Sequence, residues 1–277
     1  MKSTTKDAAD TTEPEVLPRA EGRYHLAARV DGDPFFVHYR GTDSQVGRTV
    51  RYSVILNPWR WAAGSILDAS KKLLGHERPG VLTTHYVSAD RGILVTDLPH
   101  GTALELVGCA PLPDAEVARL GRDWAAGLHA GHTEGCIHGR VEPMYLCLAS
   151  DGSGKVDGWW AHAADRQIRP TLAGIRKPRF YAMAPEQAVG AHLDACTDVY
   201  LLAAVLFHLL TGRELIPHEG LLARMSWLVE GDLSQVQADL EKRPGIGSIL
   251  CRALERKPRC RFQSASEFAN ALSGLVT

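Results

Sequence analysis

The spacing of apolar positions predicts helices in the second half of the chain. Between residues 117 and 128, large apolar side chains recur at steps of three and four, the period of an amphipathic helix with one buried face. The stretch 198–210 is apolar almost throughout and is followed by Gly212, which predicts a central helix that ends at this glycine. The segment Ser264-Ala-Ser-Glu267 has the pattern of a capping box and predicts the start of a last helix.

The first half of the chain has the patterns of strands and turns. Residues 49–56 read as a strand, and residues 85–87 and 93–95 flank the turn residues 88–92, which predicts a hairpin. Apolar residues within 66–74 predict one helix that crosses the sheet. We therefore expect an α+β chain whose first half is a small antiparallel β-sheet and whose larger second half is mainly helical.

Composition divides the chain further and limits its function. Residues 1–20 are polar and charged, so we expect a disordered tail, followed by a β-rich N-terminal lobe at 21–98 and a helical C-terminal lobe at 99–277. The formal net charge of the whole chain is −1, which excludes a global basic field for nucleic acid. Hydrophobic residues make up 45% of the 277 positions, enough for a substantial core.

The cysteines and the hydropathy of the sequence lead to predictions of its cellular location. The six cysteines form no CxxC pair, and we expect reduced, buried thiols. No hydrophobic leader and no apolar run of membrane-spanning length is present in the sequence, so we expect a cytoplasmic location and no membrane span. The group His129, His132, Cys136 and His138 has no matching second pair of ligands, and we predict no metal site.

Motifs in the helical half resemble those of bacterial serine/threonine protein kinases. The stretch Ala182-Met-Ala-Pro-Glu-Gln187 is similar to the APE motif of that family, and Asp198 lies in the large helix behind it. Arg261 stands where the family has the arginine that pairs with the glutamate of this motif, here Glu186. The resemblance covers residues 22 to 272 and implies a bilobal protein-kinase-like fold in which Glu186, Asp198 and Arg261 are structural.

The segment before this motif resembles the catalytic loop of the family, HRDxKPxxN, with His138 at its histidine. The aspartate that acts as base falls on Arg140, the phosphate-binding lysine on Glu142, and the metal-binding asparagine on Tyr145. An arginine cannot accept a proton near neutral pH, and an acid at position 142 would repel phosphate. His138 keeps the structural role that the resemblance gives it.

The family's DFG motif falls on Gly158-Trp159-Trp160, so glycine replaces the magnesium-binding aspartate. Asp157 lies one residue early, where strand alternation would turn its carboxylate to the opposite face. We expect Trp159 to take the apolar position of the motif's phenylalanine and Trp160 to pack beside it. An alternative is that one of these side chains, or Tyr145, fills the space that metal and phosphates occupy in the family.

The resemblance is weaker in the first half. Residues 28–34 keep only Gly32 of the phosphate-covering glycine loop, and the phosphate-anchoring lysine of the family falls on Ser53. Thr96 stands at the gatekeeper position and Asp97 follows it. The residues that would line a nucleotide pocket are Gly32, Ser53, Thr96, Asp97, Tyr145 and Trp159.

Taken together, the substituted positions Ser53, Arg140, Glu142, Tyr145 and Gly158 predict a pseudokinase that is not an enzyme and uses no cofactor. We expect a regulatory or scaffolding module that binds a protein, such as an active kinase or a phosphopeptide-binding protein. The basic segment 166–179 is either a solvated loop or a docking site for an acidic partner. The rival hypothesis is a nucleotide-binding, kinase-like protein with residual or unusual phosphotransfer, and a third is a cleft for another small molecule.

Overall fold

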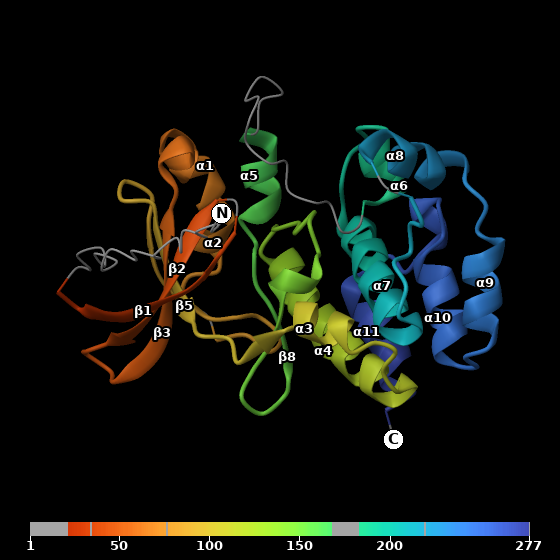
Figure 1. Ribbon diagram of the computed structural model, residues 1–277, viewed down its shortest axis with the longest axis horizontal. Coiled ribbons are helices and arrows are strands. Elements are labelled where there is room, and N and C mark those ends of the chain that lie inside the picture. The colour runs from red at the N-terminus through yellow and green to blue at the C-terminus, as the bar shows by residue number, and fades with distance from the viewer. Residues whose placement is uncertain (1–21, 34, 76, 168–182, 219, 277) are drawn as a thin grey trace, which may run out of the picture.

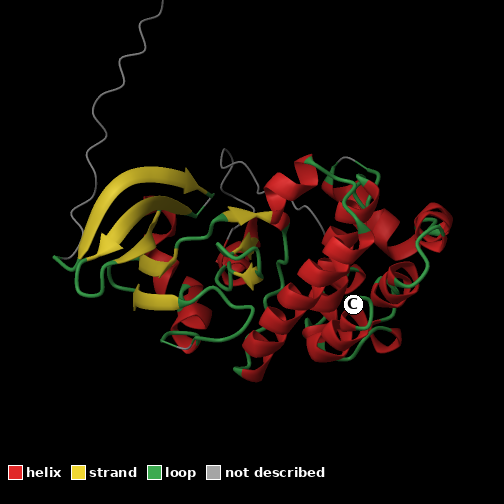
Figure 2. Cartoon of the chain, turned by 90° about the horizontal axis from the view of Figure 1, so that it is seen from below, coloured by secondary structure: helices red, strands yellow, loops and turns green. Residues whose placement is uncertain are grey.

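The computed structural model describes residues 22–33, 35–75, 77–167, 183–218 and 220–276. Within this part the large sheet lies at one end of the molecule and most of the helices at the other, as Figure 1 and Figure 2 show. The predicted α+β architecture, with a small antiparallel sheet part and a larger helical part, is therefore confirmed. The expected tail and most of the basic segment 166–179 lie outside the described residues. The boundary at residue 98 stays a prediction.

The sheet part is a five-stranded antiparallel sheet with the order β1-β2-β3-β5-β4. Its strands are β1 (Tyr24–Gly32), β2 (Phe36–Asp43), β3 (Arg48–Ile55), β4 (Thr84–Ser88) and β5 (Ile93–Asp97). The predicted strand at 49–56 is β3, and the predicted hairpin is β4 with β5. Because successive side chains of a strand point to opposite faces, Val95 packs in the cluster with Tyr24 and Tyr52, whereas Leu94 packs in the cluster with Phe36.

The single helix expected within residues 66–74 is divided between the end of α1 (Ala63–Ile66) and α2 (Asp68–Lys72). The 3-10 helix η1 (Asn57–Ala62) comes directly before α1. The break between α1 and α2 lies at Leu67, whose ψ of 0° leaves the helical range. The prediction of one helix was wrong because the backbone at Leu67, which is buried with Ile66 in the same cluster, departs from helical geometry.

Around the central helix α7, the helical part packs as one large core. It comprises β6 (Gly101–Thr102), α3 (Ala103–Gly108), α4 (Asp114–Thr133), η2 (Pro143–Tyr145), β7 (Leu146–Leu148), β8 (Gly154–Val156), α5 (Ala161–Gln167), α6 (Pro185–Ala188), α7 (Ala195–Thr211), α8 (Leu221–Glu230), α9 (Ser234–Glu241), α10 (Ile246–Ala253), η3 (Pro258–Cys260) and α11 (Ala265–Ser273). Strands β6, β7 and β8 form a second, small antiparallel sheet.

The helix ends follow the capping signals of the sequence. At the start of α7, the Asp194 carboxylate accepts hydrogen bonds from the backbone N–H groups of Cys196 and Thr197. The helix ends at Gly212, whose φ of 71° is left-handed and suits glycine. At the start of α11, the Ser264 hydroxyl accepts from the backbone N–H of Glu267 at 3.1 Å. Residues 196–210 of α7 are all buried, as the nearly continuous apolar run predicts.

Not all of the cysteines are buried, as the sequence had led us to expect. Cys136, Cys147 and Cys196 are buried, but Cys109 and Cys260 are exposed. The two exposed thiols lie at the end of α3 and in η3, where the chain turns at the surface and packing covers fewer side chains. All six are free thiols. None of the helices within the described residues is long and apolar enough to span a membrane, and the cytoplasmic location stays a prediction.

Candidate functional site

The loop at residues 138–142 is fixed by one carboxylate of the central helix. Asp198 Oδ2 accepts from the backbone N–H of His138 at 2.8 Å, and Asp198 Oδ1 accepts from the backbone N–H of Gly139 at 2.7 Å. The imidazole of His132 also lies 2.8 Å from Asp198 Oδ2. Because Asp198 is fully buried, these partners satisfy a charge that would be costly to bury alone.

His138 connects this loop to the strand end at Asp157. Its Nε2 lies 2.7 Å from the carbonyl oxygen of Asp157, and its Nδ1 accepts from the backbone N–H of Arg140 at 3.3 Å. These contacts fit the neutral tautomer with the proton on Nε2. Burial lowers the pKa of the His138 imidazole, against the opposing effect of Asp198. The histidine therefore acts as a neutral brace between the two segments.

Arg140 and Glu142, which stand at the positions of the family's base and lysine, contact each other. Arg140 Nε donates to Glu142 Oε1 at 3.0 Å, and both side chains are 4% exposed. The Arg140 guanidinium also lies 5.9 Å from the centre of the Tyr145 ring, within the range of a cation–π contact. The structure thus brings together three of the substituted positions, as a buried ion pair with an aromatic ring beside it.

A second ion pair joins the large sheet to the end of β8. Arg51 of β3 donates through a terminal nitrogen of its guanidinium to Asp157 Oδ2. Burial opposes the charge of Asp157, but the Arg51 guanidinium outweighs it and holds the pKa of this carboxyl below its usual value. The neighbouring Asp157 likewise outweighs burial and raises the pKa of Arg51. Both groups are therefore charged at neutral pH.

This pair shows where the Asp157 carboxylate lies: it faces Arg51 of β3. The next residue is Gly158, whose φ of 75° is left-handed and favours glycine. A Cβ atom at Gly158 would also lie 2.4 Å from Tyr145 Cδ1, so only glycine fits there. The sequence reasoning missed Arg51, although it lies two residues before Ser53 and so on the same face of β3.

Ser53, at the position of the anchoring lysine, is fully buried within the sheet. Its hydroxyl lies 2.8 Å from Nδ1 of His38, and Nε2 of His38 lies 3.1 Å from the carboxylate of Asp33. Asp33 Oδ1 also accepts from the backbone N–H groups of Phe35 and Phe36 at 2.7 and 2.8 Å. These contacts hold the turn between β1 and β2, in the segment that resembles the phosphate-covering loop.

The candidate pocket residues Gly32, Thr96 and Asp97 belong to the sheet. Gly32 ends β1 opposite Val37, while Pro34 lies outside the described residues. Thr96 is 1% exposed, and its hydroxyl donates to the carbonyl oxygen of Asp97 at 3.0 Å. The carboxylate of Asp97 lies 2.7 Å from His85 Nε2.

The two tryptophans at the DFG position separate instead of packing side by side. Trp159 turns into the helical core, where its ring lies 5.1 Å from that of His138. Trp160 turns into the cluster between sheet and helices, with ring centres 4.6 Å from Phe36 and 5.6 Å from Tyr145. Trp160 and Tyr145 therefore pack in the space between the sheet and the loop at residues 138–142.

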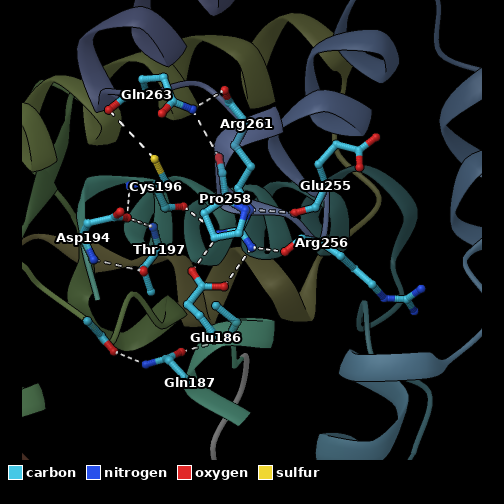
Figure 3. A network of polar contacts seen from close by, with 12 residues as sticks. Glu186, Gln187, Asp194, Cys196, Thr197, Glu255, Arg256, Pro258, Arg261 and Gln263 are labelled. Carbon is cyan, nitrogen blue, oxygen red and sulfur yellow. Dashed lines mark hydrogen bonds and ion pairs between the residues drawn. The ribbon is translucent and has the colours of Figure 1, made fainter. Parts of the chain in front are cut away.

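The APE-like motif is joined to the last part of the chain by a buried arginine, shown in Figure 3. Arg261 donates through two nitrogens to the Glu186 carboxylate, at 2.7 and 2.8 Å. The same guanidinium donates to the backbone carbonyls of Cys196, Glu255 and Arg256. Burial opposes ionisation of Glu186, but the hydrogen bond from Arg261 outweighs it and lowers the pKa of this carboxyl. This bidentate geometry is the strong form of such a pair.

Beside it, Gln187 connects the motif to the loop that Asp198 holds. Gln187 Nε2 donates to the carbonyl oxygen of Gly139 at 2.8 Å, while its Oε1 accepts from the backbone N–H of Ala184. The network of Figure 3 and the loop at residues 138–142 are thus one connected unit. Over the part of the chain that the structure describes, no group of three or more His, Cys, Asp or Glu side chains could hold a metal ion.

Comparison with known proteins supports the family suggested by the motifs. No family model matches the chain. The tyrosine-protein kinase MasK of Myxococcus xanthus is 32% identical over 191 residues, which are 64% of this chain and 29% of MasK. The serine/threonine-protein kinase pkn2 of Myxococcus xanthus is 25% identical over 272 residues, 91% of this chain and 32% of pkn2. The serine/threonine-protein kinase PknL of Mycobacterium tuberculosis is 23% identical over 273 residues, 93% of this chain and 66% of PknL.

These relatives correct one expectation. We predicted that the chain is not an enzyme. The relatives contradict this prediction, because the proteins that match the chain are named as serine/threonine and tyrosine kinases. The chain spans about a third of the length of the first two of these relatives. The fold, the order of the motifs and these similarities agree with one another: over most of its length the chain is similar to bacterial protein kinases.

Proposed function

We propose that this kinase-like domain acts as a regulatory module that binds another protein, and that its nucleotide affinity is low in the conformation described above. The observation that carries the proposal is the ion pair between Arg51 and Asp157. It spans the space between β3 and the end of β8, and both side chains are about one-tenth exposed. A nucleotide entering this space would separate two buried charges, and loss of a buried partner costs several kcal/mol.

Neighbouring contacts support the same proposal. Arg140 and Glu142 neutralise each other, and Trp160 packs against Phe36 and Tyr145. Side chains between the sheet and the loop are therefore engaged with one another. A kinase-like fold that keeps its internal framework in this way still presents a large surface to partners. The partner class that we propose is a protein, such as an active kinase or a phosphopeptide-binding protein.

Thermal unfolding of the purified domain with and without millimolar ATP and magnesium tests the proposal, because a ligand of the folded state raises the melting temperature. We expect no measurable shift for the natural chain. Variant Arg51→Met removes the charge that occupies the space, and Arg60→Met, which changes an exposed arginine of η1, is the matched control. A clear ATP-dependent shift of the natural chain would overturn the proposal.

A second candidate function is phosphotransfer, which the names of the relatives favour. In this case the ion pair between Arg51 and Asp157 opens during turnover, and the Asp157 carboxylate becomes available for a role in phosphotransfer. Incubation with magnesium and ATP labelled in its terminal phosphate would place label on the chain or on an added protein substrate. Label that appears with the natural chain and disappears with Asp157→Asn would establish this function in place of the first.

A further inference from the structure

A charged hollow has a lining that does not include the Arg51–Asp157 or Arg140–Glu142 pair. It has a volume of about 480 Å³ and is formed where the segment 77–83 runs beside β8, next to the start of β3 and the end of β5. The charged and polar residues that line it are Arg48, Glu77, Arg78, Thr83, Asp97 and Lys155. Neither Arg51 nor Asp157 belongs to this lining. The hollow therefore lies between the large sheet and the small one and shares only Asp97 with the residues expected to line a nucleotide pocket.

Two cations of the hollow have unused donors. Arg78 contacts Glu134 at 2.6 Å through one terminal nitrogen and the Thr133 hydroxyl at 3.5 Å through the other. Its buried Nε has no hydrogen-bond partner within the described residues. Buried N–H groups without an acceptor are rare and point to a missing partner. The backbone of Lys155 pairs with Cys147 in the small sheet. Its side chain lines the same hollow and makes no hydrogen bond or ion pair with any other residue that the structure describes, although its charge, after the hydrogen bonds of Ser153, helps to lower the pKa of Asp151.

The remaining charges of the hollow are of mixed sign. Arg48 lies 3.9 Å from Asp97, so these two largely compensate each other. Asp97 also lies 2.7 Å from His85 Nε2; burial opposes its charge, but the bond from His85 outweighs this and lowers the pKa of the carboxyl. Glu77 is exposed at the rim. Carboxylates accept hydrogen bonds from hydroxyl groups, whereas Arg78 and Lys155 suit an anion.

We propose that this hollow binds a small phosphorylated polyol, with its phosphate on Arg78 and Lys155 and its hydroxyl groups on Asp97 and Glu77. Arginine and lysine side chains are the usual partners of a phosphate group. The volume falls in the range of pockets that hold small organic ligands, and it exceeds what a phosphate ion alone would fill. This site goes beyond the proposed protein-binding function, and its ligand would contact the large sheet and β8 together.

Isothermal titration of the full chain tests the site with glycerol phosphate, ribose phosphate and inositol monophosphate as probes. We expect at least one of them to bind, and Lys155→Gln to weaken its binding about tenfold or more, the loss expected for one charge-assisted hydrogen bond. Lys257→Gln, which removes an exposed lysine far along the chain in the helical part, is the matched control and should leave the affinity unchanged.

Two further arms separate the parts of the proposal. Inorganic phosphate should bind more weakly than the polyol phosphate, because it offers no hydroxyl groups to the carboxylates. Glu77→Gln should weaken binding of the polyol phosphate and leave that of inorganic phosphate unchanged. The proposal is overturned if none of the three probes binds, if Lys155→Gln binds as tightly as the natural chain, or if inorganic phosphate binds as tightly as the polyol phosphates.

Discussion

At the scale of single residues, the Arg261 side chain is held by five hydrogen bonds. It is 1% exposed, and all its described partners are acceptors: the Glu186 carboxylate and three backbone carbonyls. Its ring contact with Tyr200, at 4.6 Å from the ring centre, adds a cation–π interaction. One side chain thus ties together the APE-like motif, the start of α7 and the segment after α10.

Removing this side chain should destabilise the fold strongly. We expect Arg261→Ala to lower the free energy of unfolding by about 3–5 kcal/mol, because it leaves the buried Glu186 carboxylate without its partner. Arg259→Ala, an exposed arginine two residues earlier in the same segment, should change it by no more than about 0.5 kcal/mol. Urea unfolding followed by circular dichroism measures both, and equal effects of the two substitutions would contradict the role given to Arg261.

At the scale of elements, Trp160 fixes how the helix α5 meets the sheet. It immediately precedes α5, and its ring packs on Phe35 and Phe36 at the start of β2, with centres 5.7 and 4.6 Å away. Together with η1 and α1 these residues form one buried cluster. The orientation of α5 is therefore set by an aromatic contact with residues more than a hundred positions earlier in the chain.

Truncating this ring tests how much the contact contributes. We expect Trp160→Ala to lower the free energy of unfolding by about 3–5 kcal/mol, the usual cost of removing a buried aromatic side chain. Trp61→Ala is the matched control, because Trp61 is 63% exposed although it lies in the adjoining η1. The change in the urea midpoint should be small for this control. A loss for Trp160→Ala below about 1 kcal/mol would show that the cluster is not a main determinant of the packing.

At the scale of the whole molecule, the pair Arg51 and Asp157 connects two parts that the chain builds separately. Arg51 lies in the five-stranded sheet, while Asp157 follows β8 beside the helical part. The carbonyl oxygen of the same Asp157 lies 2.7 Å from His138, so the pair is also connected to the loop that Asp198 holds. The Arg51 side chain of the sheet is thereby linked, through Asp157, to His138 in the helical part.

A double-mutant cycle measures this coupling directly. We expect Asp157→Asn and Arg51→Met each to lower the free energy of unfolding by about 3–5 kcal/mol, because each leaves the other charge buried alone. The double variant should lose clearly less than the two losses added together, since neither charge then remains. Additive losses, measured in urea, would show that the two side chains do not stabilise one another across the two parts.

The sequence by itself determined the local elements and the helical framework. The periodicity predicted α4, α7 and the β4–β5 hairpin, and the spacing of motifs predicted that Glu186 and Arg261 belong to one pattern. The helices and the hairpin depend on residues that are close together along the chain. The pair of Glu186 and Arg261 was predicted from the motifs of the family that the sequence resembles. These predictions needed no knowledge of how the sheet and the helices are oriented.

Only the tertiary structure decided which side chains meet between the two parts. Arg51 and Asp157 are 106 positions apart, and no periodicity relates them. The backbone at Gly158 is left-handed, and the two residues after it, Trp159 and Trp160, pack in different clusters. Contacts of this kind depend on backbone direction and on the orientation of distant elements, and local sequence patterns specify neither.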